Sequence, residues 1–203
     1  MGKRQHPVRG DNLRRAVAQE AARLMAEHGI HDFLTAKRKA AERFGVTENA
    51  ALPKNMEIET ALVEYQRLFG GEAHHASLNA QRVVALHAMQ RLIEFEPRLV
   101  GAVLSGTATE HSEVQLHLFT DTAESVAIKL IDAGIRHEVT ERRVRMNAER
   151  VLSCPGVRFA IENQAIEATV FPTDGIRQAP ISPVDGKPMR RADIAELAAI
   201  LKS

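Results

Sequence analysis

Apolar residues recur every three or four positions through the first 96 residues, the spacing that places them on one side of an α-helix. The pattern predicts four helices, over about residues 12–28, 31–44, 55–69 and 77–95. Asp11 or Asn12 can cap the first helix, and Gly29 ends it. Gly70 and Gly71 are expected to end the third helix, so the residues that follow them should form a loop.

From residue 98 onward the pattern changes to a period of two, which is typical of β-strands. Residues 98–121 predict an apolar strand, a turn of small residues at 105–109 and a second strand. In that second strand three aliphatic residues face one side and three polar residues face the other. They are Val114, Leu116 and Leu118 on the first side, and Glu113, Gln115 and His117 on the second.

The rest of the chain predicts several short helices and strands. Asp121 precedes a predicted helix, and residues 136–145 form a strand candidate charged on both faces, which favours the edge of a sheet. Residues 157–161 and 166–171 predict a hairpin, followed by an irregular proline-rich loop and a helix from about residue 190. We therefore expect an α+β fold: a helical region over 1–96, then a domain over 97–203 with a mixed sheet and flanking helices.

The composition and charge of the chain exclude only a few classes of protein. The net charge is +1, but residues 1–43 contain ten Lys and Arg against five Asp and Glu. Cys154 is the only cysteine, so a disulfide within the chain and a zinc site with four cysteines are excluded. We expect Cys154 to be a structural turn residue. The sequence has no apolar run long enough for a bilayer and no secretory signal pattern, so a cytoplasmic location without membrane contact is expected.

The second predicted helix carries basic residues on its outer side, including Lys37, Arg38 and Lys39. Two short helices joined by a glycine could form part of a helix-turn-helix that touches a nucleic-acid backbone. A helical hairpin with a solvated charged face explains the same pattern. Phe33 and Phe44 fit the apolar core of this region in either interpretation, and Phe69 continues the apolar stripe of the third helix.

The turn at residues 105–109 stands next to the polar row of the second strand, an arrangement that suits a phosphate or metal site. His111 or His117 could add an imidazole, a ligand that suits Zn²⁺ or Mn²⁺ better than Mg²⁺. The same residues can also be an ordinary turn followed by a half-buried strand. Arg142 lies on a neighbouring strand candidate, where it can bind phosphate or belong to a solvated edge.

The segment from Ser105, Gly106 and Thr107 to Ser112, Glu113 and Gln115 resembles the nucleotidyltransferase superfamily, whose fold is that of polymerase β. That family has a Gly-Ser turn followed by Ser-Asp-x-Asp-hydrophobic on the next strand, and a third carboxylate on a later strand. By this resemblance Glu113 matches the first carboxylate, and Gln115 takes the place of the second. Glu167 is the best match for the third.

The resemblance implies a metal-dependent transfer of a nucleotidyl group from a nucleoside triphosphate to an unknown acceptor. Glu113, Gln115 and Glu167 would hold Mg²⁺ or Mn²⁺, with Glu113 and Glu167 as catalytic residues. Ser105, Gly106, Thr107, Ser112 and Arg142 would contact the nucleotide or its phosphates. The alternative is a catalytically inactive member that binds nucleotides or nucleic acid as a regulator, because the amide of Gln115 carries no charge.

Overall fold

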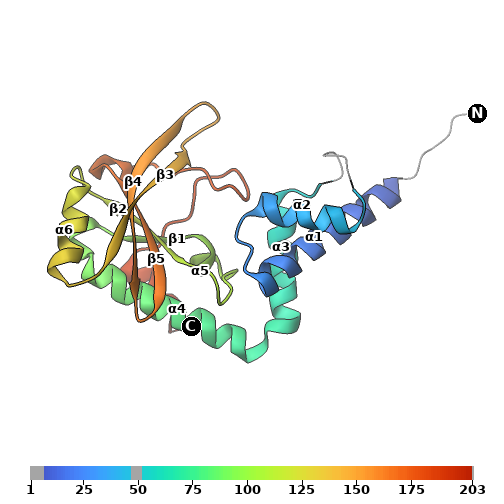
Figure 1. Cartoon of the computed structure of the whole chain (residues 1–203), viewed down its shortest axis with the longest axis horizontal. Coiled ribbons are helices and arrows are strands. Elements are labelled where there is room, and N and C mark those ends of the chain that lie inside the picture. Colours follow the sequence, from blue (N-terminus) through green and yellow to red (C-terminus); the bar gives the residue numbers. More distant parts are fainter. Residues whose placement is uncertain (1–6, 47–51, 203) are drawn as a thin grey trace, which may run out of the picture. The chain divides into compact units, whose positions relative to one another are not determined.

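The computed structural model describes residues 7–46 and 52–202, which divide into two compact units, one before and one after the junction of His74 and His75. The first unit contains α1 (Pro7–His28), α2 (Phe33–Arg43), α3 (Asn55–Tyr65) and the π-helical turn η2 (Gln66–Gly70), shown in blue to cyan in Figure 1. Helix α1 packs against both α2 and α3. The core between the helices is rich in alanine, and Ala21, Ala36 and Ala40 are each fully buried.

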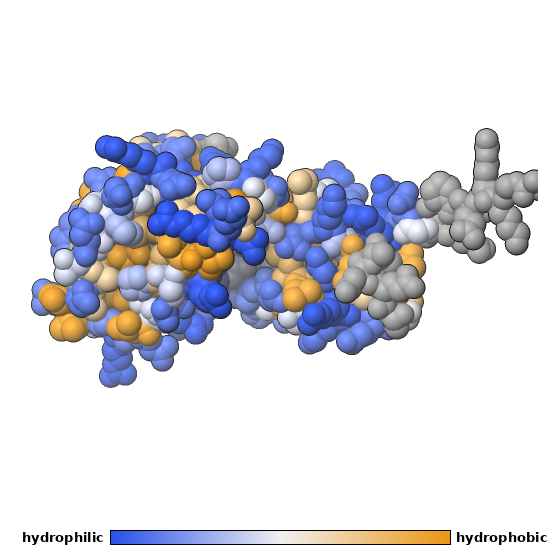
Figure 2. All heavy atoms as spheres, turned by 90° about the horizontal axis from the view of Figure 1, so that it is seen from above, coloured by the Kyte–Doolittle hydropathy of each residue, from blue (hydrophilic) through white to orange (hydrophobic). Residues whose placement is uncertain are grey.

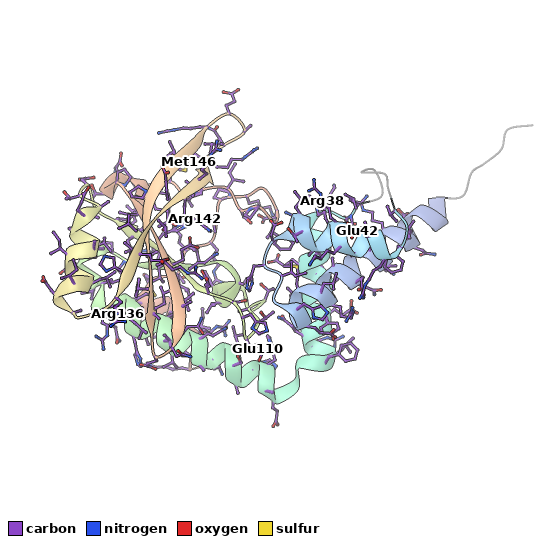
Figure 3. All side chains as sticks on the ribbon, in the orientation of Figure 1. Arg38, Glu42, Glu110, Arg136, Arg142 and Met146 are labelled. Carbon is purple, nitrogen blue, oxygen red and sulfur yellow. The ribbon has the colours of Figure 1, made fainter. Side chains whose placement is uncertain are left out.

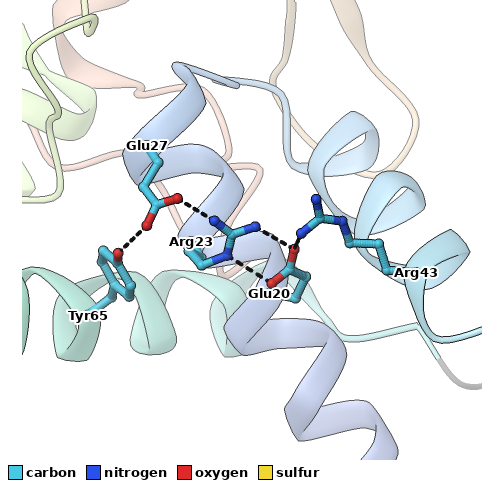
Figure 4. Close-up of polar contacts among 5 residues, drawn as sticks. All are labelled: Glu20, Arg23, Glu27, Arg43 and Tyr65. Carbon is cyan, nitrogen blue, oxygen red and sulfur yellow. Dashed lines mark hydrogen bonds and ion pairs between the residues drawn. The ribbon is translucent and has the colours of Figure 1, made fainter.

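A chain of polar contacts joins the three helices of the first unit on their surface (Figure 4). Nη2 of Arg23 lies 2.9 Å from Oε1 of Glu20, and Nη1 of Arg43 lies 2.5 Å from the same oxygen. Arg23 also pairs with Glu27, whose carboxylate accepts a hydrogen bond of 2.5 Å from the hydroxyl of Tyr65. The hydrogen bond from Arg23 lowers the pKa of Glu20 below its ordinary value.

Three expectations for the helical region are wrong. The residues after Gly71 form a helix and not a loop, because α4 (Gly71–Arg91) begins at that glycine. The side chains of Phe44 and Phe69 are 44% and 71% exposed, so neither belongs to the core. Leu68, next to Phe69 in the sequence, is exposed as well. Figure 2 shows small groups of hydrophobic residues within a mostly hydrophilic face.

The second unit contains a five-stranded sheet within the part of the chain that the structure describes. Its strands are β1 (Arg98–Val100), β2 (Val114–Phe119), β3 (His137–Arg145), β4 (Val151–Ile161) and β5 (Gln164–Phe171). The strand order is β1-β2-β5-β4-β3, in which β2 and β5 are parallel and the other neighbours are antiparallel. The mixed sheet and its helices confirm the α+β class, and the charged strand β3 lies at an edge as expected.

Helices and short turns surround this sheet. They are α5 (Gly101–Ser105), α6 (Glu124–Asp132), α7 (Ile194–Ile200) and the 3-10 turns η3 (Ile93–Phe95) and η4 (Thr173–Arg177). The main core joins one face of the sheet to residues of α4, α5, α6 and α7. Helix α4 supplies Leu78, Val84 and Met89 to it, so most of this helix belongs to the sheet unit, although the sequence placed the division after residue 96.

Two strand boundaries differ from the prediction in ways that matter for the candidate site. The first strand ends at Val100, and Gly101 to Ser105 form a helix in place of the second half of the expected strand. Strand β4 begins at Val151, so Cys154 lies inside a strand and is not a turn residue. Among the helices of residues 7–46 and 52–202, none has both the length and the apolar character needed to cross a membrane.

Candidate functional site

The two faces of β2 have different surroundings, as the alternation in the sequence predicts. Val114, Leu116 and Leu118 are fully buried in the main core. Gln115 faces the other side, where its partner in the parallel pair of β2 and β5 is Glu167. Because side chains of directly paired residues lie on the same face, the amide of Gln115 and the carboxylate of Glu167 are neighbours.

Arginines from β4 and β3 complete this polar face. Arg158 on β4 is the register partner of Glu167, and it pairs with Glu113, the residue just before β2. Arg142, in the middle of β3 (Figure 3), places its Nη1 3.0 Å from Oε2 of Glu167. We call Glu113, Gln115, Arg142, Arg158 and Glu167 the polar strip. Each of the two carboxylates suggested by the sequence is therefore ion-paired with an arginine.

Glu138 is a further acid on this face that the sequence did not suggest as a site residue. It lies on β3 directly opposite Arg158 in the register of β3 and β4, and its side chain is exposed. The charged pattern of β3 signals a solvated edge, but only the register shows which of its charges face the polar strip.

Gly101 lies against the polar strip, and the sequence analysis missed it. Its backbone has a φ of +71°, and a Cβ atom built there would lie 2.3 Å from Oε1 of Gln115. Val100, one residue earlier, is the register partner of Gln115 in the pair of β1 and β2. A side chain at position 101 would therefore displace the Gln115 amide. A glycine directly after an apolar strand is the sequence signal that could have identified this position.

Gly106, the glycine expected at the site, lies at the end of α5 and beside α4. It ends α5 with a φ of +88°, and the side-chain atoms nearest to its Cβ position belong to Arg82 and Leu78 on α4, at 3.7 and 3.9 Å. Ser105 and Thr107 flank it, and their hydroxyl groups lie 2.9 Å apart. These contacts give the turn a structural role at the end of α5 beside α4.

Ser112 also has a structural role. Its hydroxyl accepts a 2.9 Å hydrogen bond from the backbone N–H of Thr109 and is buried. Its carbonyl oxygen accepts hydrogen bonds from the amides of Gln81 and Gln164, at 3.4 and 2.8 Å. These bonds fix the loop that leads into β2, and so they set the position of Glu113.

His117, two residues beyond Gln115 on β2, is buried and held by an arginine. Its Nδ1 accepts a 3.0 Å hydrogen bond from Nε of Arg191, whose Nη1 donates to the carbonyls of Gly175 and Ile176. The guanidinium carbon lies 4.9 Å from the ring centre of Phe119 and 5.3 Å from that of Phe171. Arg191 reaches this place because Ala192, its neighbour, pairs with Leu99 of β1.

Burial, followed by the charges of Arg191 and Arg142, lowers the pKa of His117 to about 3. The imidazole is therefore neutral near pH 7, with Nδ1 as a hydrogen-bond acceptor. Burial and the charge of Arg98 lower the pKa of Arg191 to about 10, which still leaves the guanidinium charged. Because the Nδ1 lone pair is used by Arg191, this nitrogen is not available to a metal. His111 is exposed and lies 3.3 Å from Glu110.

The residues of the polar strip do not fit a resident divalent cation as they are arranged. Glu113 and Glu167 are neutralised by arginines, and Gln115 adds no negative charge. Within the described ranges, no group of three or more His, Cys, Asp or Glu side chains is placed to hold a metal ion. The amide oxygen of Gln115 alone would leave the charge of such an ion uncompensated.

The basic residues of the helical unit are partly used by the fold. Nζ of Lys37 donates to the carbonyl of Pro53 and to Oδ1 of Asn55, both at 2.8 Å, and so ties α2 to the start of α3. Arg43 pairs with Glu20, whereas Arg38 and Lys39 are exposed. Residues 1–6, which contribute to the predicted basic segment, lie outside the described residues. Nucleic-acid binding through this unit stays a prediction.

No model of a protein family matches this chain, and no curated protein matches it in sequence. The resemblance to nucleotidyltransferases thus stays a prediction that rests on the residues around the polar strip.

Proposed function

We propose that this protein binds nucleotides through the polar strip, as a nucleotidyltransferase-like protein whose strip contacts phosphate groups. One observation carries the proposal: Gln115 and Glu167 are register partners on parallel strands, with Glu113 two residues before Gln115 and Gly101 against its amide. The charged side chains of this face can contact phosphate oxygens, and the absence of a side chain at Gly101 leaves room for the Gln115 amide beside them.

The chemistry of the strip suits the polyphosphate of a nucleoside triphosphate better than a neutral ligand. Arg142 and Arg158 have side chains that are 45% and 50% exposed, so a ligand can reach both guanidinium groups. Guanidinium groups are permanently charged and bind phosphate oxygens through parallel N–H groups. The Gln115 amide can donate to a further oxygen.

Metal-dependent nucleotidyl transfer is the second candidate. Only the resemblance of Glu113, Gln115 and Glu167 to the carboxylates of that family supports it, because both acids are already paired with arginines. Mg²⁺ or Mn²⁺ would have to compete with Arg158 and Arg142 for these carboxylates. The acceptor of such a transfer is not indicated by any residue of the strip.

Equilibrium dialysis of the full chain with labelled ATP, GTP, CTP and UTP tests the first candidate. We expect saturable binding that inorganic tripolyphosphate displaces and adenosine does not, because the phosphates make the contacts. Absence of binding to all four nucleotides, with and without Mg²⁺, would contradict the proposal.

A turnover assay tests the second candidate. Transfer of labelled nucleotide in Mg²⁺ or Mn²⁺ that is lost in Glu113→Ala would favour catalysis. Glu110→Ala is the matched control, since Glu110 is an exposed acid three residues away that pairs only weakly with His111 at the surface. Equal transfer by both variants would remove Glu113 from the reaction.

A further inference from the structure

The polar strip contains two arginines, each paired with one of its two carboxylates. In a metal-dependent enzyme such carboxylates would hold a cation. Arg158 contacts Glu113, and Arg142 contacts Glu167. Both carboxylates thus already have counter-ions from the protein itself. A divalent cation at the same place would have to displace two guanidinium groups from these carboxylates, and Gln115 would offer it only a neutral amide.

The direction of the Arg142 side chain across the sheet supports a role for its positive charge in the polar strip. Arg142 is the register partner of Cys154 on β4, yet its guanidinium reaches Glu167 on β5, the next strand. Its charge also contributes to the lowered pKa of His117 on β2. The side chain therefore extends over β4 toward the centre of the sheet, because strands lie about 4.8 Å apart.

We propose that Arg142 and Arg158 replace the divalent cation, so that the protein binds the phosphates of a nucleotide without a metal. This inference rests on the proposed function, since it concerns the same strip. Glu113 and Glu167 are counter-ions that partly neutralise the two guanidinium groups, and they do not coordinate a metal. The strip is an anion site built from two ion pairs.

The geometry of the two ion pairs allows both arginines to bind phosphate as well. The ion pair of Arg142 uses Nη1, and that of Arg158 uses Nη2. A guanidinium group has five N–H donors in one plane, so one contact with a carboxylate leaves donors for phosphate oxygens. Since arginine stays charged at every accessible pH, the site does not depend on protonation of either side chain.

The test measures ATP binding to the full chain in EDTA and in Mg²⁺. We expect similar affinity in both conditions, and an affinity at least about tenfold lower in EDTA for Arg142→Gln or Arg158→Gln, since each loses charge-assisted hydrogen bonds. Arg143→Gln is the control: Arg143 follows Arg142 on β3, is exposed and, as the partner of Ser153, faces the opposite side of the sheet. It should change the affinity less than about twofold.

Thermal unfolding of each variant shows whether a loss of ATP binding is caused by a loss of fold. The two arginines lie on different strands, so the test does not depend on one variant folding correctly. ATP binding that requires Mg²⁺, with Arg142→Gln and Arg158→Gln binding as tightly as the natural chain, would overturn this inference and leave the proposed function intact. No binding in either condition would remove the proposed function, and this inference with it.

Discussion

Nη1 of Arg142 lies 3.0 Å from Oε2 of Glu167, although one strand, β4, separates the strands that carry them. The carboxylate side chain is only 12% exposed, whereas the arginine side chain is 45% exposed. The pair therefore joins an inner position of the sheet to its solvent-facing surface. It gives the polar strip a positive group beside Glu167, the register partner of Gln115.

Substitution of Gly101 should affect both stability and ligand binding. Gly101 and Gly134 have similar positive φ values, +71° and +68°, but only Gly101 has a neighbour within 4 Å of its Cβ position. Each alanine substitution should cost about 1 kcal/mol or more of unfolding free energy from backbone strain. Gly101→Ala should additionally displace the Gln115 amide and weaken ATP binding. Urea unfolding and ATP titration of both variants measure the difference, and equal ATP affinities would show that Gly101 does not border the site.

Acid should destabilise the fold through His117. Its pKa is about 3 in the folded chain and near 6.5 when unfolded, so the unfolded state binds the extra proton between these values. The stability from the neutral buried imidazole is complete above pH 6.5 and is lost as the pH falls toward 3. The unfolding free energy should fall with pH more steeply than in His117→Gln, by up to about 1.4 kcal/mol per pH unit. Parallel slopes for the two proteins between pH 6.5 and 4 would contradict the assigned burial.

The thiol of Cys154 should be unreactive in the folded protein. It is 4% exposed, and burial raises its pKa, so little thiolate is present at neutral pH. Because the chain has no other cysteine, a thiol reagent reports on this position alone. We expect labelling in native buffer to be slower than in denaturant by roughly two orders of magnitude. Equally fast labelling in both would mean that β4 is open to solvent.

The alanine-rich core of the helical unit should not accept larger side chains. Ala40 on α2 is fully buried, whereas Lys39 beside it is exposed. Ala40→Leu should lower the unfolding free energy by about 1–3 kcal/mol through overpacking. Lys39→Leu adds the same side chain on the solvent side and should change it by less than about 0.5 kcal/mol. Chemical unfolding of both variants gives the comparison.

Much of the fold could be predicted from local patterns. The alternation of Val114, Leu116 and Leu118 identified the face of β2 that enters the main core, and the charges of residues 136–145 identified the edge strand. Predictions from local patterns were wrong where packing between distant parts of the chain determines the structure. Phe44 and Phe69 are apolar but lie outside the alanine-rich core, and Gly71 begins a helix where a stop was expected.

The polar strip could be predicted only in part. The alternation in β2 placed Glu113 and Gln115 on one face, but the pairing of each carboxylate with an arginine depends on strand order and register. The contact of Arg191 with His117 joins residues 74 positions apart and has no local signal. Gly101 was not suggested by the sequence, because the expected first strand continued past Val100, where the structure has a helix that begins with this glycine.

The affinity of Glu167→Gln for ATP in metal-free buffer tests the central claim most directly. Removing this carboxylate frees Arg142 from its counter-ion, so a strip that binds phosphate through arginines should bind ATP several-fold more tightly. Glu141→Gln is the control, because Glu141 belongs to the same strand as Arg142 but its partner, Pro155, places it on the opposite face. Tighter binding in Glu167→Gln alone is the predicted result. Weaker binding, or binding by Glu167→Gln equal to that of the natural chain, would contradict it.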